Sequence, residues 1–150
     1  MTLAKQEKKT AELAAEAWSL IAEVSHANRP RFMALCREFD LFPPQMLVLK
    51  SLDEPKPMRE VAHWLACDTS NLTGIIDRLE QRDLVKRTPD PSDRRVKMLV
   101  LTDEGQRLHE EISARMSQPP PEIAALPASD LRALREIMGR ANESRVESGD

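Results

Sequence analysis

The chain has few aromatic residues and few glycines. Aromatic side chains make up 3% of its 150 residues, and tyrosine is absent. Because proteins that bind single-stranded nucleic acid stack the bases on aromatic rings, that class of function is disfavoured. There are only four glycines, and the sequence contains no phosphate-cradling loop, nucleophile–base pair or metal-ligand cluster. We therefore expect that the chain is not an enzyme and that it binds no metal or cofactor.

Cysteines and long apolar runs are also scarce. The two cysteines, Cys36 and Cys67, are too few for a structural zinc site, which takes about four ligands. No apolar run approaches the ~20 residues of a membrane span, and the beginning of the chain lacks the apolar core of a secretory signal. These absences predict a cytoplasmic protein with reduced thiols and no membrane partner.

The formal net charge is −3, but the charges are unevenly distributed. Between Arg78 and Lys97 there are seven basic residues against four acids, whereas from Asp103 to Asp150 there are ten acids against six basic residues. Basic charge is therefore concentrated in one segment, which suits a surface that meets phosphate groups.

Apolar spacing predicts a mainly α-helical single domain. Pro30 interrupts the first helical pattern, so a break is expected near residues 28–29. Asp68 is placed to cap a central helix, and Trp64 is predicted to face the interior. Helices are predicted over residues 10–39, 45–52, 58–66, 69–82, 103–116 and 128–143, strands over 84–88 and 96–102, and a loop over 53–57.

The middle of the chain combines two devices. Two short helices joined by a tight turn at residues 67–68 form a helix-turn-helix. The two strands then form a hairpin with the basic tip TPDPSDRR, which carries Arg94 and Arg95. A helix that can enter a major groove, beside a finger that can reach a minor groove, is typical of a winged helix-turn-helix. We assign this DNA-binding lobe to residues 41–104.

The terminal helices carry apolar faces that lack a partner in the central lobe. They occupy residues 10–40 and 105–146. Packing against the same helices of a second chain would bury all of these faces, so a two-fold homodimer is expected. The predicted fold is mainly α with a small β-hairpin wing, flanked by N- and C-terminal dimerisation helices.

The predicted DNA contacts come from the front of the central helix and from the two strands. The short polar side chains of the helix suit base edges and phosphates, and the basic residues of the strands are expected to touch phosphates. Gly74 allows either close approach to the duplex or close helix packing, and Arg78 either contacts DNA or forms an exposed ion pair. The candidate contacts are Ser70, Asn71, Thr73, Gly74, Arg78, Lys86, Arg87 and Lys97.

The segment LTGIIDRLEQRDLVKR followed by DPSDRRVKMLVLTDEG resembles the MarR family of bacterial winged helix-turn-helix transcription regulators. The segment FPPQMLVLKSL before MREVAHWLA also resembles the second and third helices of that family. The resemblance at the level of motifs covers about residues 41–106, and at the level of helix order most of the chain. It departs at Asp83, where the family often has glycine; aspartate tolerates the left-handed backbone that glycine would adopt there.

The resemblance implies one MarR-like domain over residues 1–150 that acts as a sequence-specific regulator of transcription. The family forms homodimers that bind approximate palindromes of double-stranded DNA, and many members are repressors. By resemblance, Arg94 or Arg95 enters the minor groove, and Asp90 or Asp93 braces the wing.

Many family members are released from DNA by small aromatic acids or by oxidation of a cysteine. By resemblance, a cleft for an aromatic or carboxylate ligand would be lined by His26, Arg29, Phe32, Met33 and Trp64, although core packing or surface ion pairs also account for these residues.

The peroxide-sensing branch of the family carries its reactive cysteine near the start of the first helix, where neither Cys36 nor Cys67 lies. Buried, inert thiols are therefore expected. Two alternatives to a ligand-released repressor stay open: a thiol-based redox-responsive regulator, and a winged helix that binds proteins in place of DNA.

Overall fold

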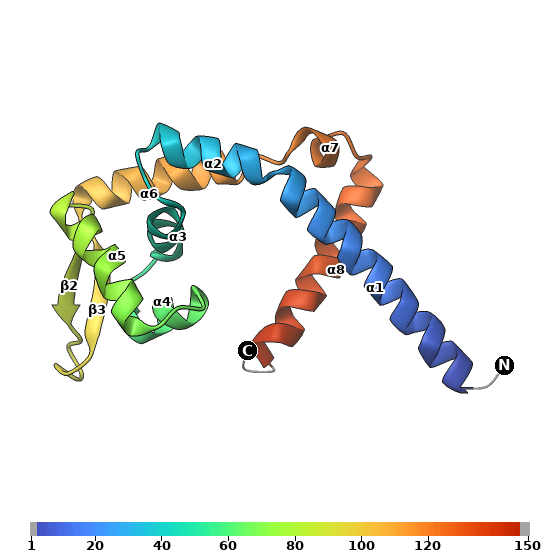
Figure 1. The fold of residues 1–150 in the computed structure, drawn as a ribbon, viewed down its shortest axis with the longest axis horizontal. Coiled ribbons are helices and arrows are strands. Elements are labelled where there is room, and N and C mark those ends of the chain that lie inside the picture. Colours follow the sequence, from blue (N-terminus) through green and yellow to red (C-terminus); the bar gives the residue numbers. More distant parts are fainter. Residues whose placement is uncertain (1–2, 148–150) are drawn as a thin grey trace. The chain divides into compact units, whose positions relative to one another are not determined.

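The computed structural model describes the backbone of residues 3–147 and forms two compact units, residues 1–116 and 117–150. Its order of elements is shown in Figure 1. The first unit holds α1 (Leu3–Ala27), α2 (Arg29–Glu38), α3 (Pro43–Ser51), β1 (Lys56–Pro57), α4 (Met58–Trp64), α5 (Thr69–Gln81), β2 (Val85–Pro89), β3 (Lys97–Leu101) and α6 (Asp103–Met116). The second unit holds α7 (Pro121–Ala124) and α8 (Ala128–Glu147).

The long N-terminal helical pattern is interrupted where the sequence predicts. Asn28 separates α1 from α2, and Pro30 occupies the first turn of α2. Proline lacks the N–H that a helix interior requires, but that N–H is unpaired in a first turn anyway. The break is therefore confirmed, and it allows α2 to take its own direction into the core of the first unit.

One continuous core fills the first unit. It is built by residues from α2 to α6, and α5 buries three residues of one face completely: Leu72, Ile76 and Leu79. Their spacing of four and three residues is that of one helical stripe. They pack in the same cluster as Met46, Val48 and Leu49 of α3, Leu99 of β3 and Ile112 of α6.

Trp64 does not face this core. Its exposed fraction is 50%, which corrects the prediction that it points inward. Val61 and Ala62 are buried and Leu65 is half-buried, so the inner stripe of α4 is centred between Val61 and Ala62. At 100° per residue, Trp64 lies more than a quarter of a turn from that stripe and projects outward.

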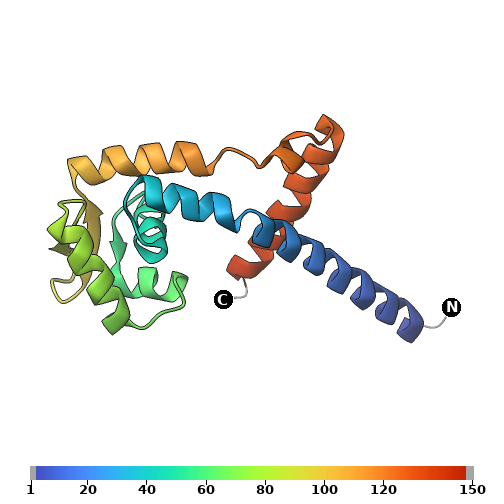
Figure 2. The ribbon, with the colours of Figure 1, turned by 45° about the horizontal axis from the view of Figure 1, so that its top comes forward.

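The turn between α4 and α5 makes the helix-turn-helix compact (the two green helices in Figure 2). Ala66 adopts a left-handed backbone with φ 51°, and the Cys67 N–H donates to the Ala62 carbonyl at 3.0 Å. The Asp68 carboxylate then accepts the Asn71 N–H at 2.7 Å, which confirms the predicted N-cap of α5.

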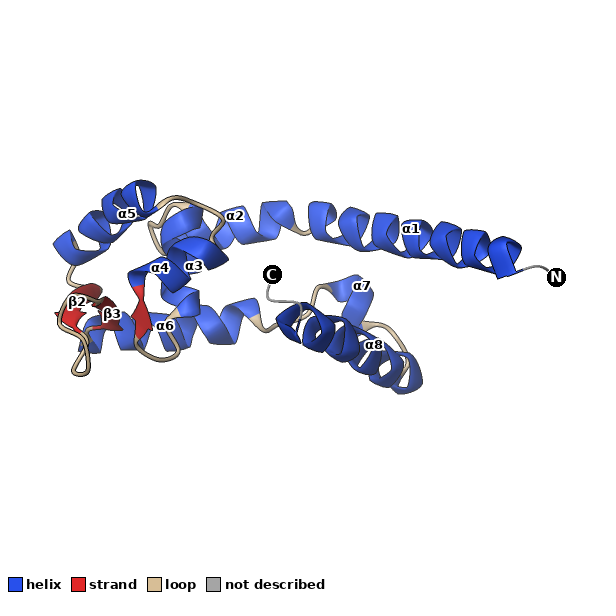
Figure 3. Cartoon of the chain, turned by 90° about the horizontal axis from the view of Figure 1, so that it is seen from below, coloured by secondary structure: helices blue, strands red, loops and turns tan. Residues whose placement is uncertain are grey.

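The sheet has three strands in the order β1-β3-β2, all antiparallel (red in Figure 3). Lys56 pairs with Leu99, and Pro57 pairs with Met98, so the prediction of a loop over residues 53–57 was wrong for its last two residues. The Lys56 ammonium holds this strand in place by donating to the Ser51 carbonyl and the Asp53 carboxylate, each at 2.7 Å.

A close contact between Gly105 and Leu84 attaches the sheet to α6. A Cβ on Gly105 would lie 1.8 Å from the Leu84 carbonyl oxygen, so only glycine fits without a backbone shift. The same oxygen accepts the Thr102 N–H at 3.1 Å, and the Thr102 hydroxyl oxygen accepts the Gly105 N–H at 2.9 Å. Asp83 precedes this joint with φ 55°, the left-handed backbone expected where the family often has glycine.

The second unit is helical, and it includes one element that the sequence reasoning missed. No helix was predicted between residues 116 and 128, but Pro121–Ala124 form the short helix α7, with proline in its first turn. None of the helices within residues 3–147 combines the length and the apolar character needed to cross a membrane.

Replacing Gly105 by alanine tests the joint between sheet and α6. We expect the free energy of unfolding to fall by about 3 kcal/mol, because the added methyl group collides with a backbone carbonyl that cannot rotate away. Denaturant unfolding measures this change. The matched control is Gly74→Ala, since a Cβ on Gly74 meets no atom within 4 Å and alanine raises helix propensity by about 1 kcal/mol. Equal midpoints for Gly105→Ala and the wild type would contradict the proposed contact.

Candidate nucleic-acid interface

The front of α5 presents a cluster of small polar groups. The Asp68 carboxylate accepts the Ser70 hydroxyl at 2.6 Å and the Asn71 backbone N–H at 2.7 Å, and the Asn71 side-chain amide lies 3.3 Å from its second oxygen. The Ser70 hydroxyl and then the Asn71 N–H lower the pKa of Asp68. The hydrogen bonds to Asp68 fix the shape of the first turn of α5. Because all three side chains are exposed, this turn is open to a ligand.

The next turn of α5 is exposed and open. A Cβ on Gly74 would meet nothing within 4 Å, so the alternative that this glycine serves close helix packing is wrong. The Thr73 hydroxyl donates to the Thr69 carbonyl at 2.8 Å and keeps its lone pairs available outward. Arg78 is exposed and forms no ion pair with any described residue, so its guanidinium is available to a partner.

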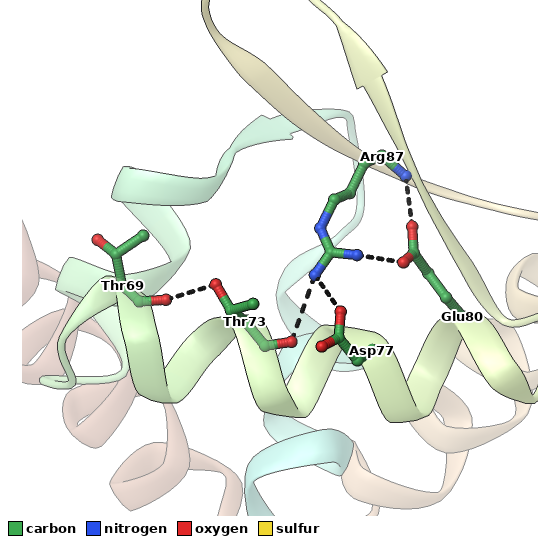
Figure 4. A network of polar contacts seen from close by, with 5 residues as sticks. All are labelled: Thr69, Thr73, Asp77, Glu80 and Arg87. Atoms are coloured by element: carbon green, nitrogen blue, oxygen red, sulfur yellow. Dashed lines mark hydrogen bonds and ion pairs between the residues drawn. The ribbon is translucent and has the colours of Figure 1, made fainter.

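Arg87 connects β2 to α5 through a network of polar contacts (Figure 4). Its guanidinium binds the Asp77 carboxylate at 2.7 Å and the Thr73 carbonyl at 3.3 Å, and it also pairs with the Glu80 carboxylate. The Arg87 backbone N–H donates to Glu80 at 3.0 Å. The side chain predicted as a phosphate contact therefore neutralises two acids of α5 and holds the helix against the strand.

The two lysines of the hairpin point from opposite faces of the sheet. Lys97 lies two residues before buried Leu99 on β3, so the two side chains are on the same face of the sheet, together with Arg87, the partner of Leu99. Lys86 pairs with Val100, whose side chain is on the opposite face. Both lysines are exposed. Lys97 therefore shares the α5 side of the sheet with Arg87, and Lys86 does not.

The tip of the wing is an ordered turn. The Asp90 carboxylate accepts the Ser92 N–H at 2.7 Å, the Ser92 hydroxyl at 2.6 Å and the Asp93 N–H at 3.3 Å. The Ser92 hydroxyl and N–H lower the pKa of Asp90. Asp93 in turn accepts the Arg95 N–H at 3.0 Å.

These bonds hold the tip while its two arginines extend into solvent. Arg94 is exposed, and the Arg95 side chain is 95% exposed with its Nε 3.7 Å from Asp93. Two guanidinium groups on a braced turn form a positive projection next to the open face of α5. The hydrogen bonds that Asp90 accepts hold the turn in shape, although the turn has no apolar core of its own.

The five residues predicted to line a ligand cleft differ in their exposure. His26, Arg29 and Trp64 are exposed, whereas Phe32 and Met33 are half-buried, and Phe32 packs against the core. A hollow does lie beside α5, but none of these five residues lines it. Its walls are Phe42, Pro44, Gln45, Asn71, Gly74, Ile75 and Arg78.

Phe42 is a residue of this surface that sequence reasoning missed. It stands at the N-cap of α3 before two prolines, and its exposed fraction is 66%. A large apolar residue in a position that usually favours serine, threonine, aspartate or asparagine is the signal that was available.

The two cysteines differ in environment. Cys36 is buried in the core, and burial raises the pKa of its thiol, so the thiolate form that reacts with oxidants is disfavoured. Cys67 is half-buried at the turn before α5, and both thiols are free. No group of three or more metal-ligating side chains was found within the described part of the chain.

Known proteins share both the sequence pattern and the fold. Residues 41–97 match the model of the MarR family. The HTH-type transcriptional regulator MgrA of Staphylococcus aureus is 28% identical over 125 residues, which cover 82% of this chain and 84% of MgrA. The HTH-type transcriptional repressor MdtR of Bacillus subtilis is 36% identical over 88 residues, which cover 57% of each chain.

A solved structure extends the similarity to the whole fold. CouR from Rhodococcus jostii RHA1, with bound p-coumaroyl-CoA, superimposes with a TM-score of 0.67 at 28% identity and covers 84% of this chain and 91% of its own. The matched segment contains the helix-turn-helix and most of the wing described above. Residues 41–97 thus match the MarR family of winged helix-turn-helix regulators, and the chain is similar to regulators of that family in sequence and fold.

Proposed function

We propose that this chain is a sequence-specific regulator of transcription that binds double-stranded DNA in the cytoplasm as a homodimer and acts as a repressor. The observation that carries the proposal is the pairing of an open polar face on α5 with a braced wing that projects Arg94 and Arg95. The exposed face of α5 suits base edges in a major groove, and the wing suits the adjacent minor groove. The proposal assigns no catalytic activity to the chain.

The contacts divide by role. Ser70, Asn71, Thr73, Gly74 and Arg78 would face base edges and nearby phosphates, because they form the outward ridge of α5. Lys97 would bind a phosphate from the same side, and Asp90 and Asp93 would keep the wing in shape. Arg87 would act as a positioning residue, because its guanidinium already binds three acceptors of α5.

The apolar residues that the terminal helices leave exposed support a homodimer. On α1, Trp18 and Leu20 are 68% and 62% exposed, and Leu13 is 56% exposed. On α8, Ile137 is 53% exposed. Exposed apolar residues at this density mark an interface. A two-fold axis would present two copies of α5 to successive major grooves of an approximate palindrome.

Release by a small aromatic or carboxylate ligand is the proposed mode of regulation. CouR, which has a similar fold, was solved with bound p-coumaroyl-CoA. A ligand would act by favouring dimers whose two α5 helices are mis-spaced for DNA. His26, Arg29, Phe32, Met33 and Trp64 remain the candidate contacts, provided that ligand binding draws them together.

Two alternatives make different predictions. A winged helix that binds proteins would need neither Arg94 nor Arg95, yet both are exposed on an ordered turn. A thiol-based regulator would need a reactive cysteine, and the raised pKa of buried Cys36 disfavours it for that role. Selection of duplexes from a random DNA pool at near-physiological salt separates sequence-specific DNA binding from a winged helix that binds only proteins. Enrichment of a two-fold symmetric site supports the proposed function, and weak binding without sequence preference contradicts it.

Removing the two arginines of the wing should abolish specific binding. For Arg94→Ala with Arg95→Ala we expect at least a roughly thirtyfold loss of affinity for the selected site, because each arginine in a narrow minor groove contributes on the order of 1–3 kcal/mol. Fluorescence anisotropy with labelled duplex measures the loss. The control with the same change of charge is Arg31→Ala with Arg37→Ala on α2, where both side chains are exposed. Equal losses in the two double variants would contradict a specific role for the wing.

The faces of the sheet predict different roles for its two lysines. Lys97→Ala should make the dependence of log K on log[salt] shallower by roughly 0.9 per contact and leave the selected sequence unchanged. Lys86→Ala is the matched control, because that lysine is equally exposed on the opposite face. Titrations between about 50 and 200 mM salt provide both slopes. A larger effect for Lys86→Ala would show that the DNA meets the other face of the wing.

A double-mutant cycle distinguishes bracing by Arg87 from contact with a phosphate. Arg87→Met should weaken DNA binding strongly in the wild type, since it leaves Asp77 and Glu80 unneutralised near the DNA. In a background of Asp77→Asn with Glu80→Gln, we expect the same change to have a much smaller effect. The affinities of the four proteins for the selected duplex complete the cycle. The same loss in both backgrounds would indicate a direct phosphate contact.

A further inference from the structure

The hollow beside α5 is formed where the N-terminus of α3 meets this helix. Phe42 is the N-cap of α3 and Pro44 lies in its first turn, whereas Asn71, Gly74, Ile75 and Arg78 come from α5. Most of the lining is apolar, and the polar groups of Asn71 and Arg78 belong to the same outward surface as Ser70. The hollow therefore continues the surface that we assign to DNA.

Two features make the hollow an ordered part of that surface. The Phe42 N–H donates to the Gln45 side-chain oxygen at 2.8 Å, and Gln45 is itself buried, so the start of α3 is held in place. Gly74 leaves the floor of the hollow empty, because a Cβ there would meet nothing within 4 Å. The Phe42 side chain is 66% exposed and lines the hollow, so it would be covered by whatever occupies the hollow.

The chemistry of the major groove restricts what that occupant is. Base edges in the groove carry hydrogen-bond donors and acceptors, and the thymine 5-methyl group is the apolar feature among them. A base that approaches the ridge of α5 at Gly74 would bring this methyl group against Phe42. Arg78 at the rim would meet the neighbouring phosphate or base edge.

We infer that the hollow between Phe42 and Gly74 is a specificity subsite that receives the 5-methyl group of one thymine in each half-site. This inference rests on the proposed function, since it requires DNA against α5. Phe42 forms the apolar wall, and Gly74 leaves room for the methyl group. The chain would thereby distinguish thymine from cytosine at that position through an apolar contact.

Replacement of thymine by deoxyuridine removes the methyl group and leaves the base pair intact. In the selected duplex, each thymine is replaced symmetrically in both half-sites, and affinities are measured for the wild type, Phe42→Ala and Phe42→Leu. For the wild type we expect one replacement to weaken binding about fourfold per half-site, the value of one buried apolar carbon. Phe42→Ala should lose this sensitivity at that thymine alone, and Phe42→Leu should retain most of it. Thymines at other positions serve as internal controls.

Gly74→Ala provides a second variant that does not depend on Phe42. It should fold at least as stably as the wild type, and its methyl group should remove the preference for thymine at the same position. Equal responses of wild type and Phe42→Ala to every replacement would overturn the subsite and leave sequence-specific DNA binding standing. A selected half-site without thymine would have the same consequence. Failure to select any site would overturn the proposed function, and this inference with it.

Discussion

Burial of one face of α5 determines which side chains of this helix face outward. Leu72, Ile76 and Leu79 are fully buried, so the helix cannot rotate about its axis without exposing them. At roughly 1.5–3 kcal/mol for each buried side chain of this size, such a rotation is strongly unfavourable. The opposite ridge, with Ser70 and Gly74, must therefore face outward. The packing of the core thus decides which side chains could meet DNA.

Charge is arranged around this helix so that its acids are satisfied within the protein. Asp77 and Glu80 would repel phosphate, but Arg87 binds both of them and also a backbone carbonyl of α5. The wing shows the opposite arrangement. Its acids accept backbone N–H and hydroxyl groups of the turn, and its arginines extend outward. A chain with a formal net charge of −3 can in this way present a positive surface where it is needed.

Close contacts join α5 and the sheet to α2 and α6. Gly105 lies against the Leu84 carbonyl, and Arg82 at the end of α5 donates to the carbonyls of Phe39 and Asp40. Farther along α6, Arg115 forms a two-pronged ion pair with Glu38 at 2.7 and 2.8 Å, which lowers the pKa of Glu38 and raises that of Arg115.

The sequence by itself determined the order of the helices other than α7, the break at Asn28, the cap at Asp68 and the hairpin with its arginine tip. These features depend on residues close together along the chain: a proline in a first turn, a carboxylate three residues before an N–H, or a stripe of apolar residues at helical spacing. Only the tertiary structure decided that β1 pairs with β3 and that Trp64 faces outward. It also decided that Arg87 binds acids of α5 and that Phe42 and Gly74 form one hollow. Each of these depends on contacts between residues far apart in the sequence, for which local propensity carries no signal.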